Sequence, residues 1–248
     1  MGKTITDPQE AALELKERVG KARRVVFFGG AGVSTASGIP DFRSADGLYH
    51  QHFKYPPETM LSHRFYETHT KEFYDFYRER MICLTAKPNK AHYKLAELEK
   101  AGKLSAVVTQ NIDGLHQAAG SRRVYELHGS VLRNFCRVCR RFYSAEYIKS
   151  SEGVPRCECG GIIKPDVVRY EEGLDVSVVT GALNAIQTAD TLIIAGTSLT
   201  VYPAAGFIRY FRGSNIVLIN RDATPYDSHA DLVFHESVGA LLDQIQVR

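Results

Sequence analysis

Long apolar runs are missing from this 248-residue chain, where none reaches the roughly 18 residues that a membrane-spanning helix needs. A strong charge of one sign is missing too, because 31 Lys and Arg residues nearly balance 28 Asp and Glu residues and leave a net charge of +3. These two absences argue against a membrane partner and against a specific nucleic-acid partner. No signal peptide is recognisable in the opening Met-Gly-Lys-Thr-Ile-Thr-Asp, so we expect a cytoplasmic protein with reduced thiols.

Internal repeats, low-complexity tracts and long linkers are absent as well. The length therefore permits one large domain, or one domain that carries an insert. Hydrophobic residues make up 44% of the chain and charged residues 24%, close to the average of soluble proteins, so a full hydrophobic core can form.

Short apolar runs alternate with helical patterns along the chain. Helices are predicted after Asp7, which reads as an N-cap with Glu10 completing a capping box, and at residues 90–100 and 176–187. Continuous apolar strands between helices are typical of a parallel sheet that is covered on both faces, which places the chain in the α/β class. The predicted strands are residues 25–28, 104–109, 124–127, 192–195 and 216–219.

Cysteine is scarce, but four of the five cysteines stand in two close pairs with 17 residues between them: Cys136, Cys139, Cys157 and Cys159. This spacing resembles a zinc ribbon, and four thiolates would close the coordination shell of a Zn²⁺ ion, which favours a structural ion over a catalytic one. Two disulfides or four reduced core thiols remain as alternatives. The fifth cysteine, Cys83, is expected to be a buried apolar thiol.

Ligands bind parallel sheets at the carboxyl ends of the strands. After the first predicted strand comes Gly29-Gly30-Ala31-Gly32-Val33-Ser34, a glycine-rich turn that suits a phosphate group at a helix start. The third glycine and the later acidic residue of the dehydrogenase fingerprint are both missing. The turn alone could also be no more than a tight connection between strand and helix.

The other strand ends carry polar side chains that an apolar core does not require. Three alternatives to a role in binding stay open: Asn111 or Asp113 can act as a helix N-cap, and His128 can be structural. In chain order the polar residues are Gln110, Asn111 and Asp113, then His128, then Thr197 and Ser198, then Asn220.

Taken together, these segments resemble the sirtuins, a family of NAD-dependent protein lysine deacylases. The resemblance runs from about residue 22 to about residue 245, with the motifs in the family's order and spacing. The motifs are Gly30-Ala31-Gly32-Val33-Ser34, Gly38-Ile39-Pro40-Asp41-Phe42-Arg43, Gly47-Leu48-Tyr49, Thr109-Gln110-Asn111-Ile112-Asp113, His116, Glu126-Leu127-His128-Gly129, the four cysteines and Gly196-Thr197-Ser198-Leu199.

The resemblance implies a Rossmann-like NAD-binding domain and a smaller lobe made of two inserts. The domain would comprise residues 1–46, 88–130 and 167–248. The lobe would comprise a helical insert, 47–87, and a zinc-binding insert, 131–166.

The family's reaction consumes NAD: the acyl oxygen of a modified lysine attacks the ribose carbon that bears nicotinamide, and nicotinamide leaves. A histidine then deprotonates a ribose hydroxyl, and O-acetyl-ADP-ribose is released together with the free lysine. His128 matches this general base, and an imidazole that titrates near neutral pH suits the role. Asn111 would be the second catalytic residue.

The remaining cofactor contacts are carried over position by position. Ala31 and Thr35 would line the pyrophosphate, Phe42 and Arg43 would sit on a mobile loop, and Gln110 would hold ribose hydroxyls together with Asn111. Ile112 and Asp113 would form the nicotinamide pocket, while Thr197, Ser198, Asn220 and Val238 would meet the adenosine end. An acyl-lysine peptide would lie between residues 167–169 and 199–202 as an added strand.

Two departures from the family pattern concern the substrate. Residues 169–172 read Arg-Tyr-Glu-Glu where the family often has Phe-Gly-Glu, which would put a cation at the peptide edge. The Tyr-x-x-Arg pair of desuccinylating sirtuins is replaced by Tyr74-x-x-Tyr77, so neutral acyl groups are expected unless Arg78 or Arg80 substitutes.

Two other functions remain as alternatives. One is ADP-ribosyl transfer to protein on the same fold. The other is a non-catalytic zinc-ribbon module that binds DNA or a protein partner through the arginines around the first cysteine pair, Arg133, Arg137, Arg140 and Arg141.

Overall fold

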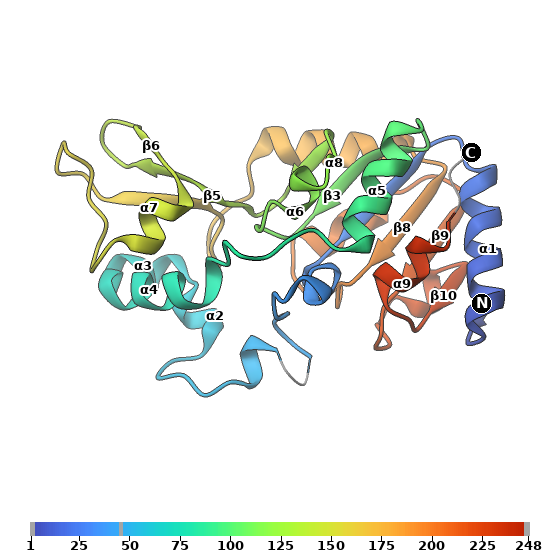
Figure 1. Ribbon diagram of the computed structural model, residues 1–248, viewed down its shortest axis with the longest axis horizontal. Coiled ribbons are helices and arrows are strands. Elements are labelled where there is room, and N and C mark those ends of the chain that lie inside the picture. The colour runs from blue at the N-terminus through green and yellow to red at the C-terminus, as the bar shows by residue number, and fades with distance from the viewer. Residues whose placement is uncertain (1–2, 45–46, 246–248) are drawn as a thin grey trace.

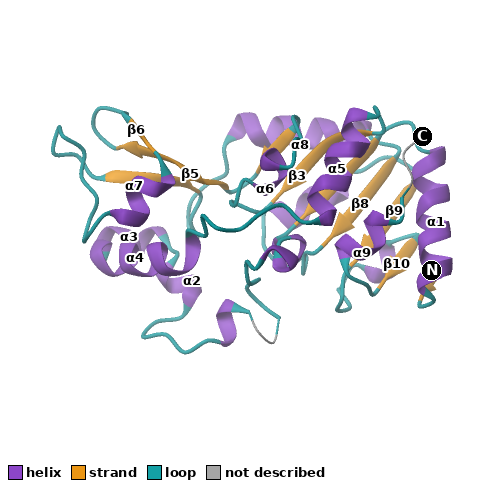
Figure 2. Ribbon diagram, in the orientation of Figure 1, coloured by secondary structure: helices purple, strands orange, loops and turns teal. Residues whose placement is uncertain are grey.

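A seven-stranded parallel sheet forms the larger part of the molecule (Figures 1 and 2). The structure, a computed structural model, describes residues 3–44 and 47–245. From one edge to the other, the strands are β1 (Lys3–Ile5), β10 (Leu232–Phe234), β9 (Asn215–Ile219), β8 (Thr191–Ala195), β2 (Val25–Gly29), β3 (Leu104–Thr109) and β4 (Val124–Glu126).

Helices cover both faces of this sheet. In the central strand β2, Val25 and Phe27 belong to one hydrophobic cluster, while Val26 and Phe28 belong to another on the opposite face. Successive side chains of a strand point to opposite faces, so an uninterrupted apolar run is buried only where both faces are covered. The first cluster includes side chains of α1 (Pro8–Lys21), α5 (Lys90–Lys100) and α9 (Val238–Asp243); the second includes those of α8 (Val176–Thr188) and a 3₁₀ segment (Ala204–Tyr210).

The predicted elements are confirmed: all five strands and the three helices lie within one residue of their expected bounds. The capping-box prediction at α1 is only half right. The Asp7 carboxylate accepts a hydrogen bond from the Glu10 amide at 2.8 Å, but the Glu10 carboxylate pairs with Lys3 Nζ at 2.6 Å rather than reaching back to Asp7. The outer strands β1 and β10 were not predicted.

A smaller lobe lies beside the carboxyl-terminal edge of the sheet, at the left of Figure 1. Its antiparallel sheet has the order β6-β5-β7, and it packs with a group of short helices into a third hydrophobic cluster. The elements are β5 (Gly129–Cys136), β6 (Phe142–Tyr143), β7 (Ile163–Val167), α7 (Ala145–Ser150), α2 (Pro57–Met60), α3 (His63–Thr68) and α4 (Thr70–Phe76). A π-helical turn (Tyr77–Met81) follows α4.

Aromatic side chains dominate the core of the smaller lobe. Tyr66, Phe73, Tyr74 and Tyr77 are each at most 1% exposed, and their rings contact one another edge-on or stacked. The helices within 47–87 agree with the helical character expected of this segment, and these large side chains supply its apolar contact area. No helix within the described residues is long and apolar enough to cross a membrane.

Two expectations about single side chains are wrong. Cys83 is exposed rather than buried, since it lies in the loop between the π-helical turn and α5. Arg169 does not present a cation at the peptide edge: it is 5% exposed and turned into the smaller lobe. There its guanidinium carbon lies 3.8 Å from the centre of the Tyr66 ring, and Nη2 pairs with Glu172 at 2.6 Å.

Candidate active site

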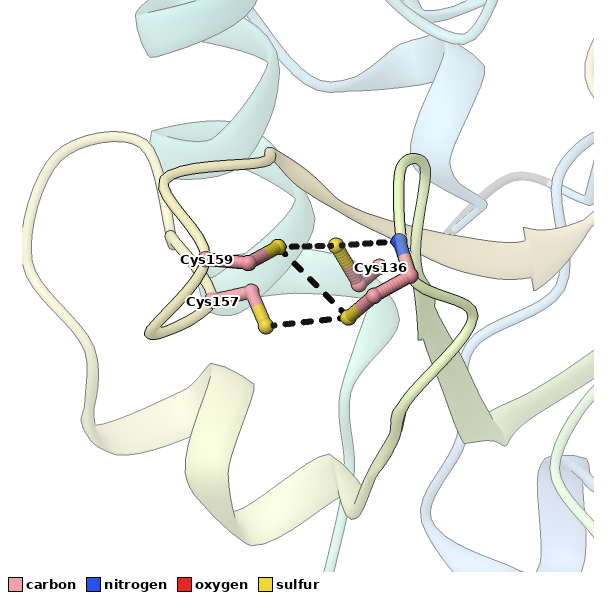
Figure 3. Close-up of side chains that lie close together, drawn as sticks. Cys136, Cys157 and Cys159 are labelled. Carbon is pink, nitrogen blue, oxygen red and sulfur yellow. Dashed lines mark hydrogen bonds between the residues drawn. The ribbon is translucent and has the colours of Figure 1, made fainter.

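The four predicted metal ligands converge at the tip of the smaller lobe, where the turn after β5 meets the segment before β7 (Figure 3). Their sulfur atoms all lie within 4.8 Å of one another, and the shortest separations, 3.4 and 3.5 Å, are far longer than a disulfide bond of about 2 Å. The disulfide alternative is therefore excluded.

This cluster fits a tetrahedral zinc ion. Zn–S bonds of about 2.3 Å place the sulfurs of a tetrahedron about 3.8 Å apart, close to the separations found here. Cys136 and Cys157 are buried while Cys139 and Cys159 are exposed, so the ion would join two loops at the surface. A side chain at Gly161 would collide with the Cys136 sulfur at 2.7 Å, which explains why glycine follows the second pair.

The glycine-rich turn after β2 packs directly against the end of β8. The Gly32 amide donates to the Gly196 carbonyl at 2.8 Å, and a Cβ atom at Gly32 would lie 2.8 Å from the Gly196 Cα atom. Gly196 itself has a φ of 60°, in the left-handed region that favours glycine. These glycines thus bring two strand-end loops together, and within the first of them Thr35 Oγ1 donates to the Gly32 carbonyl.

Gln110, Thr197 and Asn220 form a chain of hydrogen bonds across the ends of three strands. Gln110 Nε2 donates to Thr197 Oγ1 at 3.0 Å. The Asn220 side chain clamps the main chain of Thr197, accepting from its amide at 3.0 Å and donating to its carbonyl at 2.7 Å. Because Asn220 is 7% exposed and its amide is used in this way, it positions Thr197.

Ser34 is the centre of a second hydrogen-bond network, which joins β2 to β3. Its hydroxyl donates to Asp113 Oδ2 at 2.6 Å and accepts from Asn111 Nδ2 at 3.0 Å. Ser34 is 1% exposed and Asn111 is 9% exposed, so the network is largely screened from water. The Asp113 carboxylate also accepts from the Leu115 amide at the start of α6 (Leu115–Ala118), but the N-cap residue of this helix is Gly114 rather than Asn111 or Asp113.

Two buried histidines, His92 and His116, lie beside this network. His92 Nδ1 accepts from the Asn89 amide at the start of α5, so Nε2 carries the hydrogen and faces Ser34 Oγ at 3.5 Å. The His116 ring contacts the His92 ring edge-on, and neither His116 nitrogen has a hydrogen-bond partner among the described residues. Burial, followed by the neighbouring His92, lowers the pKa of His116 to about 3, so both rings are neutral at physiological pH.

His128 follows β4 and lies next to the end of β3. Its Nδ1 is 2.9 Å from the Gln110 carbonyl oxygen, which can only accept, so Nδ1 carries the hydrogen and Nε2 bears the lone pair. Burial lowers the pKa of His128, and the bond to Gln110 offsets part of that effect. The imidazole is therefore a neutral base with a fixed orientation.

The adjacent Gly129 is required by the close approach of β5 and β7. Its φ is 75°, and a Cβ atom there would lie 2.0 Å from the Asp166 carbonyl oxygen. Two residues further into the lobe, Val131 donates from its amide to the Ile112 carbonyl at 2.9 Å. The base and the predicted nicotinamide-pocket residue Ile112 thus both sit where the large sheet passes into the smaller lobe.

The other predicted cofactor residues are more widely spread. Phe42 and Arg43 both contact the Tyr49 ring, and Arg43 also pairs with Glu58 at 3.6 Å. Ser198 is half-buried and shares a hydrogen bond with Thr200. Three residues have no such polar contact: Ala31 is half-buried in a 3₁₀ turn, Ile112 packs on the smaller lobe, and Val238 lies in the core at the start of α9.

A cleft of about 720 Å³ lies between the smaller lobe and the loop after β8. Tyr170 stands in one wall, where its main chain pairs with Leu61 and His63 at the junction of α2 and α3, and Tyr202 also lines the cleft. The Tyr170 hydroxyl lies 2.6 Å from that of Tyr49, which links this wall to the predicted mobile loop. Residues 200–202 of the expected peptide position line this cleft, but its other wall is formed by Tyr170 and Glu171 rather than by residues 167–169.

The sequence alone did not single out Ser34, His92 or Glu171. Ser34 lies within a motif that matches the family, but the sequence assigned no role to it. His92 lies in the first turn of a helix, and the sequence feature that could have revealed it is the N-cap Asn89, three residues earlier. Glu171 has a φ of 72° and caps α3 by accepting from the Arg64 amide at 3.0 Å. This conformation favours glycine, which the family often has in this run.

Comparison with known proteins agrees with this arrangement. The sequence profile of the Sir2 family matches residues 30–203. An NAD-dependent protein deacetylase of Clostridium acetobutylicum is 59% identical over 94% of this chain and 96% of its own length, and one of Staphylococcus aureus is 43% identical over 93% and 96%.

Solved structures show the same similarity. A Sir2 structure with a deacetylated p53 peptide and 3′-O-acetyl ADP ribose matches with a TM-score of 0.86 at 38% identity, covering 94% of this chain and 96% of that one. A Sir2 homolog–NAD complex matches with a TM-score of 0.86 at 34% identity, covering 98% and 94%. The chain belongs to the Sir2 family.

Proposed function

We propose that this protein is an NAD-dependent protein lysine deacetylase that releases nicotinamide and O-acetyl-ADP-ribose. The observation that carries the proposal is His128: a neutral imidazole with a free Nε2, fixed by Gln110 at the carboxyl edge of the sheet. Relatives named as NAD-dependent protein deacetylases align over nearly the whole chain, and related Sir2 structures hold NAD or acetyl ADP ribose.

The loops at the strand ends fit NAD. The glycines after β2 and β8 leave no side chain between the two loops, so the main-chain amide of Ala31 can approach a pyrophosphate. NAD supplies the ribose carbon that takes the acyl oxygen, with nicotinamide as the leaving group. Gln110 and Asn111 hold ribose hydroxyls, while Asp113 and Ile112 form the nicotinamide pocket.

The roles of the remaining predicted NAD-binding residues are assigned from their positions in the structure. Thr35 and Ser198 line the phosphates and the adenosine end, and Phe42 and Arg43 cover the ribose from their loop. Asn220 acts through Thr197, whose main chain it clamps. Val238 supports the adenine side from the core, because its side chain is 6% exposed.

His128 is the general base, and Asn111 is the second catalytic residue. With Nδ1–H committed to Gln110, Nε2 accepts the proton of a ribose hydroxyl, which then attacks the acyl carbon. The buried imidazole is neutral at pH 7 and ready to accept that proton. A positioned base of this kind contributes typically about 10²–10⁴-fold in rate.

One Zn²⁺ ion held by the four cysteines is structural. All four ligand positions are filled by thiolates, so the ion has no site for a substrate and acts by joining the two loops of the smaller lobe. The lobe comprises residues 47–87 and 131–166, and the NAD-binding domain comprises 1–46, 88–130 and 167–248. Thiolate ligands suit the reducing cytoplasm, where we place the protein.

The substrate is an acyl-lysine peptide bound in the cleft beside Tyr170. A related Sir2 structure is bound to acetylated peptide. Neutral acyl groups are preferred, because Tyr74 and Tyr77 are buried in the aromatic core and the two arginines considered as replacements, Arg78 and Arg80, are engaged in ion pairs. Arg78 pairs with Asp75 at 2.7 Å, and Arg80 pairs with Glu79 at 3.1 Å.

A product balance tests this function. Acetyl-lysine and succinyl-lysine versions of one peptide are incubated with NAD, and lysine peptide, nicotinamide and acyl-ADP-ribose are quantified by mass spectrometry. The proposal predicts equal amounts of all three products from the acetyl peptide and slower turnover of the succinyl peptide. Peptide that gains ADP-ribose would support the transferase alternative, and faster desuccinylation would contradict the acyl preference.

A further inference from the structure

A second cleft, of about 1130 Å³, lies at the amino ends of the parallel strands. His128 lies at the other end of the strands, where they reach their carboxyl termini. Two arginine pairs reach the cleft, each immediately before a strand: Arg23 and Arg24 before β2, and Arg122 and Arg123 before β4. Lys100, at the end of α5, is a fifth cation in its wall. The cleft is separate from the strand ends that the proposed reaction uses.

Each arginine pair is fixed through its main chain by one carboxylate. Asp190 Oδ2 accepts from the amides of Arg23 and Arg24 at 2.8 and 3.0 Å. Glu99 accepts from the amides of Arg122 and Arg123 at 2.8 and 2.9 Å. The two turns are therefore held in place, while their guanidinium groups are left for other partners.

The positive charge in the cleft is not balanced by ion pairs. Among the described residues, none of these five cations forms an ion pair; Arg24 and Arg123 reach only main-chain carbonyls, those of Thr188 and Ser105. Of the two acidic side chains in the lining, Glu97 pairs with Lys94 outside it, and Glu99 binds main-chain amides. The cleft thus contains several cations that have no anionic partner among the described residues.

We propose that this cleft binds a phosphate-bearing ligand of nucleotide size. Guanidinium groups bind phosphate oxygens through paired, charge-assisted hydrogen bonds, and Arg23 and Arg122 have no side-chain partner among the described residues. Tyr93, 55% exposed in the same wall, offers an aromatic face on which a base can stack. The volume suits a small molecule, and the phosphate can come from a free nucleotide or from a nucleic-acid backbone.

Binding is measured by isothermal titration with inorganic tripolyphosphate and with ATP, and the cleft variants distinguish this cleft from the proposed NAD site. The wild-type chain is compared with Arg23→Gln, Arg122→Gln and the double variant. Arg212→Gln is the matched control, because this exposed arginine touches only neighbouring carbonyls and lies outside both clefts. A short single-stranded oligonucleotide forms the second arm.

We expect one bound ligand per chain, an affinity reduced about tenfold or more by each cleft variant, no change in Arg212→Gln, and ATP favoured over tripolyphosphate through Tyr93. Deacetylation of a saturating acetyl peptide should persist in the variants, so failure here leaves the proposed function intact. No binding at millimolar ligand, or equal losses in Arg212→Gln, would each overturn the proposal. If the oligonucleotide binds more tightly than ATP and its affinity rises with its length, the claim that the ligand is of nucleotide size is wrong.

Discussion

The Nδ1 atom of His128 lies 2.9 Å from the main-chain oxygen of Gln110. This contact ties the residue after β4 to the residue after β3, and it fixes which nitrogen of the imidazole is free. Gln110 in turn donates from its side chain to Thr197, so the proposed base and the loop after β8 are coupled through one residue. The orientation of the base therefore depends on residues that follow three strands of the sheet, β4, β3 and β8.

The pH dependence of the reaction should report the titration of His128. Burial lowers its pKa below the ordinary histidine value of about 6.5, and only the neutral ring accepts a proton. We expect kcat/KM for the acetyl peptide to stay level from pH 8 down to about 6.5 and to fall below that. The measurement is a pH–rate profile; a midpoint above pH 7 on the acidic limb would contradict the shift.

The Ser34 hydroxyl should control the proposed nicotinamide pocket. Ser34→Ala removes the hydrogen bonds to Asp113 and Asn111, so both side chains lose their fixed positions. We expect kcat/KM for NAD to fall by roughly 100-fold, because a catalytic group misplaced by about 1 Å can cost that much. Steady-state kinetics beside exposed Ser228→Ala measures the effect, and equal kinetics in the two variants would refute it.

Metal content should separate the cysteine cluster from the remaining cysteine. We expect purified protein to contain one zinc ion per chain, and Cys136→Ala to contain almost none and to melt at a lower temperature. Cys83→Ala is the matched control, since Cys83 is exposed and lies outside the cluster. Elemental analysis with thermal unfolding makes the comparison; a chain that keeps its stability and activity after chelation would rule out a structural ion.

The Arg169–Glu172 pair should stabilise the smaller lobe. Burial alone would raise the pKa of Glu172, but hydrogen bonds from Arg169 outweigh it and lower the pKa to about 2. Arg169→Met leaves this carboxylate without its main partner and should cost about 3 kcal/mol of unfolding free energy. Denaturant unfolding beside Arg80→Met, at a more exposed ion pair, tests this; equal losses in both variants would show that burial of the pair is unimportant.

The sequence predicted the sheet well because its central strands are buried on both faces, which leaves long apolar runs such as 104–109. It missed β1 and β10, which have three residues each; β4 is equally short but was found together with the polar motif that follows it. The cysteine cluster was predictable from spacing alone, since a zinc site requires close ligand pairs. Arg169 was misplaced because no local pattern shows that a cation will stack on Tyr66 and pair with Glu172.

The polar network of the candidate site was only partly predictable. Strand ends gave Gln110, Asn111 and His128, because polar residues directly after apolar strands have no place in the core. Their mutual contacts depend on how three strands align, which the sequence does not contain. His92 lies 58 residues from Ser34 along the chain, and only the fold brings the two together.

The most direct test of the proposed reaction is mass spectrometry of an acetyl-lysine peptide incubated with the protein, with and without NAD, beside His128→Ala. The account predicts deacetylation with nicotinamide release only when NAD is present, and a loss of about 10²–10⁴-fold in the variant. Deacetylation without NAD, or an unchanged rate in His128→Ala, would contradict it.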